Sequence, residues 1–594
     1  ISNMCGICGQ LRFDGKNVSS KSLKTMMTRL ARRGPDSSGQ WVDGKIGFGH
    51  QRLSIIDLSS HGAQPMLDDA LNLALVFNGT IYNYKKLRVQ LTNKGYSFFS
   101  HSDTEVILKA YHYWGEDCVE HLDGMFALCV YDITRQKLFI ARDRMGIKPL
   151  YYSLSSRAFT FASNTQALLT QNIDETINPI ALQQQLSLHG VVPAPNTIIN
   201  GIRKVKPATT ITIDSKGEWK EKTYWKPLAE RSNGEISDDD YTERAHELLT
   251  LAVAKRMSAT DVPIGVLLSG GLDSSLIVAL LNEVGHKNIR TFSIGFEDIE
   301  DEAGSEFEFS DQVVEKFNTN HNKYIVKNEE VLPRLFEAVS NMAEPMVGQD
   351  AVAFYLLSEK VSRHVKVVLS GQGADEVFAG YFWYPRMAQE QGNEVERFAK
   401  HYVDRPHEEF LQTVMSTYHC PNHTNKWLTK EFNKSGAETF MDKVLRTDIT
   451  RLIVDDPVKR VDNMTMAWGL EARVPFMDTD LVEWALKMPA SLKMKGDGKF
   501  PLKKIARELL PTSVIDRKKG YFPMPALKYV QGEYLEFMSD ILTSNACINR
   551  GIFSQEYVNN VINSPRKYMT ALNGSRLWHL ALLEFWIQIN IDQK

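Results

Sequence analysis

The sequence predicts an α/β protein of two domains: packed sheets flanked by helices, then a doubly wound parallel sheet with a helical C-terminal part. Three observations support this. The chain has 594 residues, which is too long for one core of ordinary size. Short β-type runs punctuated by turn dipeptides fill the first part, up to about residue 205. From Asp239 onward, short apolar runs alternate with helical patterns, as in a parallel sheet that is covered on both faces.

The first domain, which we place at residues 5–205, combines β-type runs with two helical patterns. The expected strands are Ile46–His50, Ala74–Phe77, Phe126–Tyr131, Leu138–Ala141 and Ala158–Ala162. The expected helices are Lys21–Ala31 and Thr104–Trp114. Residues 206–238 are rich in Lys, Pro, Gly and Ser apart from a short β-like run at Thr209–Ile213, so we expect a linker there.

The second domain, at residues 239–594, is where strands and helices alternate. The expected strands are Pro263–Leu268, Arg290–Phe296, a short one at Ile325, and Val365–Leu369. The expected helices are Ser274–Val284, Ser310–Phe317 and Val352–Ser362. From about Arg397 the sequence is mostly helical. Because ligands of such sheets bind at the carboxyl ends of the strands, the loops that follow the strands are the candidate site.

The composition excludes several classes of protein. Apolar residues make up 43% and charged residues 24%, so the chain is not largely disordered or fibrous. Lys and Arg total 69 against 72 Asp and Glu, which excludes a basic stripe over the whole protein and disfavours nucleic acid as a partner. Six sparse cysteines favour a reducing, cytoplasmic location over a disulfide framework. Neither a membrane span nor a secretory signal is visible.

The first chemically distinctive residue is Cys5, which directly follows Met4. Removal of that Met would give Cys5 a free α-amine, whose pKa of about 7.7–8.0 suits it as general base for its own thiol. Ile1–Asn3 precede Met4, and we interpret them as a cloning remnant or an unremoved leader that blocks the amine while attached. The alternative is that Cys5 is a buried apolar residue, as most free cysteines are.

Four further residues of the first domain have side chains that suit an amino-acid substrate. Asn78 and Gly79 offer an amide and a backbone N–H, which together make a natural oxyanion hole. Arg52 and Asp103 offer a guanidinium and a carboxylate for the two ends of an amino acid. Taken singly, Asn-Gly is most often a hairpin turn, and the two charged residues would more often be surface charges or a helix cap.

Several motifs in order connect these residues to a family. They are Met4-Cys5-Gly6-Ile7-Cys8-Gly9, Arg33-Gly34-Pro35-Asp36, Arg52-Leu53-Ser54-Ile55, Asn78-Gly79 and Ser102-Asp103-Thr104-Glu105. Together they resemble the N-terminal-nucleophile (Ntn) glutaminase domain of class II amidotransferases, an αββα sandwich. The resemblance implies that Cys5 attacks the side-chain amide of L-glutamine and releases ammonia. It also implies that Asn78 and Gly79 form the oxyanion hole and contact glutamine, and that Arg52 and Asp103 hold glutamine.

One position departs from the glutaminase pattern. The family's common Asn-Gly-Glu reads Asn78-Gly79-Thr80 here. Because Thr80 has no carboxylate, one glutamine contact that the resemblance implies is missing at this position.

Two loops after expected strands have the residue types of a phosphate site. They are Ser269-Gly270-Gly271-Leu272-Asp273-Ser274-Ser275 and Ser370-Gly371-Gln372-Gly373-Ala374-Asp375-Glu376. Small residues expose backbone N–H groups, and a helix N-terminus adds partial positive charge. Asp273 and Asp375 suit one shared Mg²⁺ that bridges phosphate oxygens. The alternative for the first loop is a glycine turn that caps an ordinary helix.

Three later segments complete a second resemblance. They are Asp462, Glu471-Ala472-Arg473-Val474-Pro475-Phe476-Met477-Asp478 and Arg517-Lys518-Lys519-Gly520. With the two loops they resemble the synthetase domain of glutamine-dependent asparagine synthetases, which has an adenine-nucleotide α-hydrolase-like (ATP pyrophosphatase) fold. The alternatives are that Glu471 and Arg473 form a buried ion pair and that Lys519 is a solvated lysine.

The second resemblance implies the chemistry of the other half of the reaction. ATP is cleaved between its α- and β-phosphates, the substrate carboxylate becomes an acyl-adenylate, and ammonia reaches it through a shielded passage between the domains. The implied ATP and pyrophosphate contacts are Leu268, Ser269, Gly271, Asp273, Ser274, Ile294, Ser370, Gly371, Asp462 and Lys519. Lys519 is also implied as a catalytic residue that neutralises phosphate charge, and Asp273 and Asp375 as the Mg²⁺ ligands. A homodimer is compatible with the resemblance.

The acceptor carboxylate is indicated by finer differences. Gln372 stands where the family usually has an acid, and a glutamine cannot hold an ammonium. The aromatic run at 381–384 suits a larger substrate than aspartate, with Arg386 as a carboxylate contact, although core packing is the alternative. With Val191-Val192-Pro193-Ala194-Pro195, these segments resemble N-acetylglutaminylglutamine amidotransferases, which would amidate an acetylated Gln-Gln dipeptide to give a compatible solute for osmotic stress. The alternatives are an asparagine synthetase and, from another class, a non-catalytic regulator that binds nucleotide or amino acid.

Overall fold

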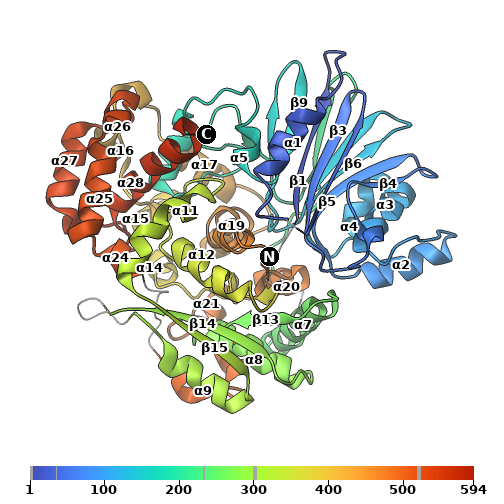
Figure 1. The fold of residues 1–594 in the computed structure, drawn as a ribbon. Coiled ribbons are helices and arrows are strands. Elements are labelled where there is room, and N and C mark those ends of the chain that lie inside the picture. The colour runs from blue at the N-terminus through green and yellow to red at the C-terminus, as the bar shows by residue number, and fades with distance from the viewer. Residues whose placement is uncertain (1–4, 35, 232–233, 299–303, 518–523, 594) are drawn as a thin grey trace.

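A computed structural model describes residues 5–34, 36–231, 234–298, 304–517 and 524–593. The N-terminal domain forms one side of the molecule, with the parallel sheet of the second domain below it and the C-terminal helices beside that sheet (Figure 1). Each expected strand and helix of the two domains has a counterpart, with ends that differ by a few residues.

The N-terminal domain is a sandwich of two six-stranded sheets. In order across the first sheet the strands are β10 (Arg203–Lys204), β8 (Tyr151–Leu154), β9 (Ala158–Ala162), β1 (Gly6–Arg12), β3 (Ile46–Arg52) and β2 (Ser37–Asp43). Across the second they are β12 (Trp219–Thr223), β11 (Thr209–Asp214), β7 (Lys137–Arg142), β6 (Gly124–Asp132), β5 (Leu73–Ile81) and β4 (Met66–Asp68). Apolar side chains that alternate along the strands, such as Ile7, Phe48 and Val76, fill the space between the sheets.

Helices cover both outer faces of this sandwich. Helix α1 (Ser20–Thr28) packs on β1 and β3, while α2 (Tyr84–Asn93) and α3 (Asp103–Trp114) lie on the side of β5 (Figure 1). This is the expected αββα arrangement, so the predicted Ntn-type fold is confirmed.

The stretch that we expected to be a linker belongs to the sandwich. Strand β11 pairs with β7 over Thr210–Asp214, and β12 continues the sheet as its edge. The sequence misled us because β12 exposes four of its five residues and therefore has a linker-like composition. The first domain thus extends to about Thr223, and helix α7 (Asp238–Ser258) opens the second.

The second domain is built on a five-stranded parallel sheet, as predicted. In spatial order its strands are β15 (Asn320–Val326), β14 (Arg290–Phe296), β13 (Ile264–Leu267), β16 (Val367–Leu369) and β17 (Glu471–Arg473). Alternate residues face opposite layers: Val266 packs with α7 and α8 (Leu272–Glu283), whereas Leu267 packs with α12 (Asp350–Val361) and α19 (Pro457–Met466). Burial on both faces explains the continuous apolar runs.

The C-terminal part is helical, as predicted. Its longer helices include α15 (Glu394–Tyr402), α17 (His423–Phe432), α18 (Phe440–Thr447), α20 (Thr479–Lys487), α25 (Gly532–Thr543), α27 (Gln555–Asn563) and α28 (Arg576–Ile587). Among the described residues, none of the helices is both long and apolar enough to cross a membrane.

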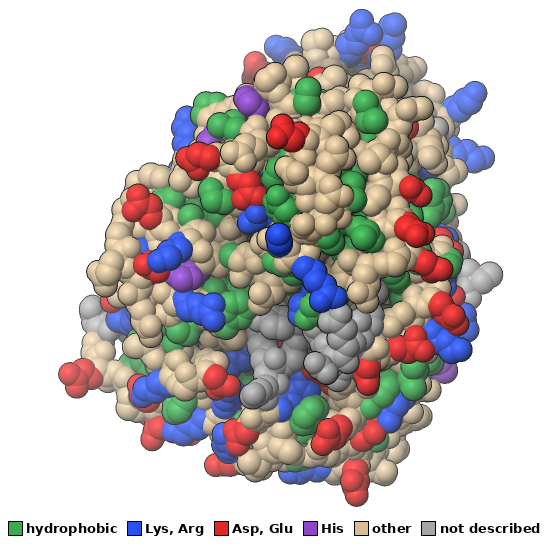
Figure 2. Space-filling model, turned by 90° about the vertical axis from the view of Figure 1, so that its left-hand side faces the viewer, with side chains coloured by type: hydrophobic (Ala, Val, Ile, Leu, Met, Phe, Trp, Pro, Cys, Tyr) green, Lys and Arg blue, Asp and Glu red, His purple; other side chains and the backbone are tan. Residues whose placement is uncertain are grey.

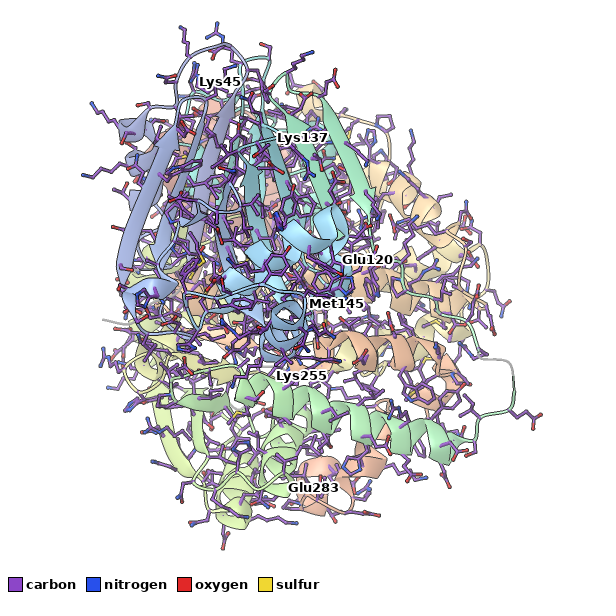
Figure 3. The ribbon with its side chains drawn as sticks, turned by 90° about the vertical axis from the view of Figure 1, so that its right-hand side faces the viewer. Lys45, Glu120, Lys137, Met145, Lys255 and Glu283 are labelled. Atoms are coloured by element: carbon purple, nitrogen blue, oxygen red, sulfur yellow. The ribbon has the colours of Figure 1, made fainter. Side chains whose placement is uncertain are left out.

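Charged side chains join the two domains. Lys255 on α7 pairs with Asp123 of the first domain, and Figure 3 shows Lys255 close to that boundary, with Lys45 and Lys137 at the outer end of the sandwich. Deeper inside, Lys204 pairs with Glu344 and Asp455 of the second domain at 3.1 and 3.0 Å. On the outer surface, positive and negative side chains are interspersed over the face in Figure 2, as the small net charge suggests.

Candidate functional site

The first candidate pocket collects the five residues that the sequence assigned to glutamine. Cys5 lies just before β1, Arg52 ends β3, Asn78 and Gly79 lie in β5, and Asp103 begins α3; all five line one cavity. Strands of both sheets and a helix N-terminus therefore converge on the Cys5 thiol.

The Cys5 thiol is protonated in this environment. Its Sγ accepts the Leu53 N–H at 3.4 Å, and burial raises the pKa of Cys5 to about 11. Attack on an amide therefore needs a base that removes the thiol proton. The α-amine of Cys5 has that role in our prediction, and residues 1–4, which would have to be removed first, lie outside the described residues.

Asn78 and Gly79 have the properties of an oxyanion hole. Both side-chain atoms of Asn78, Oδ1 and Nδ2, are buried without a hydrogen-bond partner among the described residues, so the amide is available to a ligand. Gly79 has φ of 149°, and a Cβ there would lie 2.0 Å from the Met125 carbonyl oxygen, so only glycine fits.

Arg52 and Asp103 are both held in place by backbone groups. The Arg52 guanidinium donates to the carbonyls of Ser59, at 2.9 Å, and Asp57. Asp103 accepts the Ile81 N–H at 3.0 Å, while burial, together with the nearby charge of Glu471, raises its pKa to about 7.

Glu471 is a residue of this pocket that sequence analysis missed. It comes from β17 of the second domain, lines the cavity beside Asp103, and accepts the Thr80 hydroxyl at 3.0 Å. Arg473 Nε donates to the same carboxylate at 2.6 Å, so the ion pair considered as an alternative is present. The carboxylate missing at Thr80 is thus supplied by the other domain, and the departure at Thr80 is the signal that could have prompted the search for it.

The second candidate pocket lies at the carboxyl ends of β13, β14 and β16. It is lined by these residues of the predicted nucleotide set: Leu268, Ser269, Gly271, Asp273, Ser274, Ile294, Ser370, Gly371 and Asp375. The first loop is fixed by its own hydroxyls, since Gly271 N–H donates to Ser269 Oγ at 3.2 Å. The loop then opens α8, whose first residues, Leu272–Ser274, line the cavity, as in sites where a helix N-terminus binds phosphate.

Lys499 is the residue of the second pocket that sequence analysis missed. Its ammonium lies between the two predicted metal ligands, 2.6 Å from Asp273 and 2.8 Å from Asp375. Burial alone would lower the pKa of Lys499, but the two carboxylates outweigh it and raise the pKa, so the side chain is charged. Two carboxylates from adjacent strand ends thus converge on one cation, and carboxylate oxygens are ligands that Mg²⁺ takes in phosphate-binding sites.

One predicted nucleotide contact does not appear in this pocket. Asp462 is absent from its lining; its carboxylate instead accepts from Arg33 at 3.0 Å and Lys148 at 3.1 Å, both of the first domain. A buried carboxylate needs such partners, and the sequence could not show that they come from the other domain. Lys519 lies outside the described residues.

The aromatic run beside the second pocket is largely packed into the core. Trp383 and Tyr384 are buried, and the rings of Tyr381 and Trp383 stack at 4.1 Å. Exposed Arg386 lies over the Phe382 ring and not in the lining of the pocket, so the carboxylate contact we expected of it is not seen. Core packing, the alternative interpretation, accounts for these contacts.

Two tyrosines of the aromatic run are hydrogen-bonded to buried acids, Glu376 and Asp448. Tyr381 donates to Glu376 at 2.8 Å, and Tyr384 donates to Asp448. Burial raises the pKa of both carboxyls. Gln372, in contrast, lines the pocket itself, where it presents a neutral amide.

Comparison with known proteins matches both halves of the chain to families. Residues 4–225 match the family described as glutamine amidotransferase domain, and residues 244–588 match the family described as asparagine synthase. Among curated proteins, asparagine synthetase [glutamine-hydrolyzing] 1 of Bacillus subtilis is 32% identical over 100% of this chain and 98% of its own length. Asparagine synthetase [glutamine-hydrolyzing] 3 of the same organism is 30% identical over the full length of both.

Proposed function

The chain belongs to the asparagine synthase family, and from that premise we propose how its two pockets divide the reaction and which carboxylate it amidates. It is an ATP-dependent ligase that takes its amide nitrogen from glutamine. The first pocket would then release ammonia, and the second would activate the acceptor.

In the first pocket, Cys5 attacks the side-chain carbonyl of glutamine. The free amide of Asn78 and the N–H of Gly79 stabilise the oxyanion that forms. Arg52 binds the α-carboxylate of glutamine, and the α-ammonium lies between Asp103 and Glu471. A second acid in this place compensates for the missing carboxylate at Thr80.

In the second pocket, the Ser269–Ser274 loop and the N-terminus of α8 bind the phosphates of ATP. Lys499, which lines the same cavity, would add positive charge beside the phosphates, and Lys519 remains a proposed phosphate contact. Asp273 and Asp375 would hold a Mg²⁺ that neutralises phosphate charge. Leu268 and Ile294 line the wall where adenine would lie.

The acceptor we favour is an acetylated dipeptide, N-acetylglutaminylglutamine, which would be converted to its C-terminal amide. The observation that carries this is Gln372, a neutral amide in the lining of the pocket. An acetylated dipeptide has no free ammonium and presents amides, which a glutamine side chain can hydrogen-bond. Aspartate has an ammonium that would need an acid there. The product, a neutral amide, suits the role of a compatible solute.

Aspartate remains the second candidate acceptor, because the names of the full-length relatives favour it. Pyrophosphate release, measured with each acceptor, distinguishes the dipeptide from aspartate. Ammonium is used as the nitrogen source because it bypasses any block at Cys5. We would compare acetyl-Gln-Gln, unacetylated Gln-Gln and aspartate. Turnover with acetyl-Gln-Gln, and weaker turnover with Gln-Gln, would support the proposal. Turnover only with aspartate would make the protein an asparagine synthetase.

A further inference from the structure

Three metal-binding side chains from distant parts of the chain meet outside both pockets. His189 follows α6 (Pro179–Ser187) in the first domain, Asp404 follows α15, and His579 lies on α28. The Nδ1 of His579 is 3.3 Å from one Asp404 oxygen, and the Nδ1 of His189 is 3.7 Å from the other. None of the three lines the thiol pocket or the nucleotide pocket.

The donor atoms of this cluster lack hydrogen-bond partners. Among the described residues, Asp404 Oδ1 and the Nδ1 atoms of both histidines are buried without one. Asp404 Oδ2 accepts the His189 backbone N–H at 3.1 Å and is also the oxygen 3.3 Å from His579 Nδ1, whereas Oδ1 is the oxygen 3.7 Å from His189 Nδ1. Asp404 and His579 are almost fully buried, at 1% and 2% exposure. Three unsatisfied polar atoms at one buried point are costly unless something binds them.

The spacing of these atoms suits a small divalent ion. They all lie within 4.8 Å of one another. Bonds of about 2.0–2.1 Å in a tetrahedral site place neighbouring donors about 3.3 Å apart. The two nitrogen–oxygen distances, 3.3 and 3.7 Å, are close to that value. His189 is the most exposed member, with 17% of its side chain accessible, so the cluster is nearest to solvent on that side.

We propose that His189, Asp404 and His579 bind one zinc ion, in a structural site that joins the first domain to the C-terminal helices. Two imidazoles and a carboxylate are donors that zinc takes readily, with water in the fourth position. The guanidinium of Arg405 is a nearby positive charge that opposes a cation, and its Nε donates to Leu186 O at 3.1 Å.

The test is the metal content of the untagged full-length protein, supplied with zinc and then dialysed against metal-free buffer. We expect about one zinc per chain by mass spectrometry, and a visible absorption band of tetrahedral Co²⁺ when cobalt replaces it. Asp404→Asn and His579→Gln should lose both signals. His286→Gln, which changes a histidine just after the end of α8, is the matched control and should keep both.

Two further measurements keep the result unambiguous. The first is ammonium-driven pyrophosphate release, which shows whether each variant is folded. The second is the Tm of the chelator-treated wild type, which should rise when zinc is added. The proposal is overturned if the wild type holds no zinc and gives no cobalt band. It is equally overturned if folded Asp404→Asn binds as much zinc as the wild type. The three side chains would then be a plain hydrogen-bonded group.

Discussion

Replacing Glu471 by glutamine tests whether the second domain contributes to glutamine binding. The substitution removes a negative charge from the thiol pocket but keeps an oxygen that can accept the Thr80 hydroxyl at its present 3.0 Å. It also breaks the ion pair with Arg473, whose guanidinium still donates to the carbonyls of Arg256 and Ala259. The variant should therefore fold, with reduced stability.

The size of the effect follows from the interaction that is lost. A hydrogen bond to a charged group contributes about 1.5–3 kcal/mol, which corresponds to about a 10- to 150-fold fall in kcat/KM for glutamine. Ammonium-driven synthesis needs no glutamine and should be nearly unchanged. The assay is glutamate release against glutamine concentration, with ammonium-driven pyrophosphate release as the internal control. Glu483→Gln, which changes an acid that bonds Trp225 away from the pocket, is the matched variant.

The pH dependence of kcat/KM for glutamine gives a second test of Glu471, through its effect on the pKa of Asp103. Asp103 must be ionised to hold an ammonium, and its pKa is about 7 because of burial and the charge of Glu471. In the wild type, kcat/KM for glutamine should fall as the pH drops below about 7. In Glu471→Gln one like charge is gone, so the pKa of Asp103 falls and the decline should begin at lower pH. An unchanged profile and an unchanged kcat/KM would refute the role of Glu471.

Three other substitutions test the rest of the scheme. Cys5→Ala should abolish glutamine-driven synthesis and spare ammonium-driven synthesis; loss of both, in a folded protein, would contradict separate pockets. Asp273→Asn should abolish pyrophosphate release while glutamate release persists in part, and retained pyrophosphate release would show that Asp273 is not a metal or phosphate residue. Asp462→Asn leaves the buried cations Arg33 and Lys148 without their carboxylate. It should lower the free energy of unfolding by about 3–5 kcal/mol, measured by denaturant titration. No loss of stability would mean that this contact between domains is dispensable.

The parts of the fold that the sequence predicted are those whose pattern is local. Short β-type runs between turn dipeptides predicted the sandwich strands, and short apolar runs that alternate with helical patterns predicted β13 and β14. Strand β17 has no such pattern. Its residues are Glu, Ala and Arg, and the two charged ones can be buried because they form an ion pair with each other within the strand. The edge strand β12 was missed for the opposite reason, since exposure gives it the composition of a linker.

The same division applies to the site. A residue in a strand–turn–helix motif, such as Asp273, could be found because the motif carries its own geometry. Lys499 could not, because nothing near it in sequence marks it: it lies more than a hundred residues from both carboxylates it contacts, after a turn at Gly498. Asp462 was placed at the nucleotide by resemblance, yet its partners are in the first domain.

Strand β17 is the element that lies between the two pockets. Its Glu471 carboxylate lines the thiol pocket, and the carbonyl of Arg473, two residues later, accepts the N–H of Ser370 in the second phosphate loop at 2.9 Å. A three-residue strand is short and rigid when paired, as this one is with β16 over its whole length. A displacement of the phosphate loop by nucleotide would therefore be transmitted to Glu471 through one backbone hydrogen bond. Glutamine hydrolysis in the wild type should then respond to ATP, and in Glu471→Gln that response should be lost even where residual hydrolysis remains measurable.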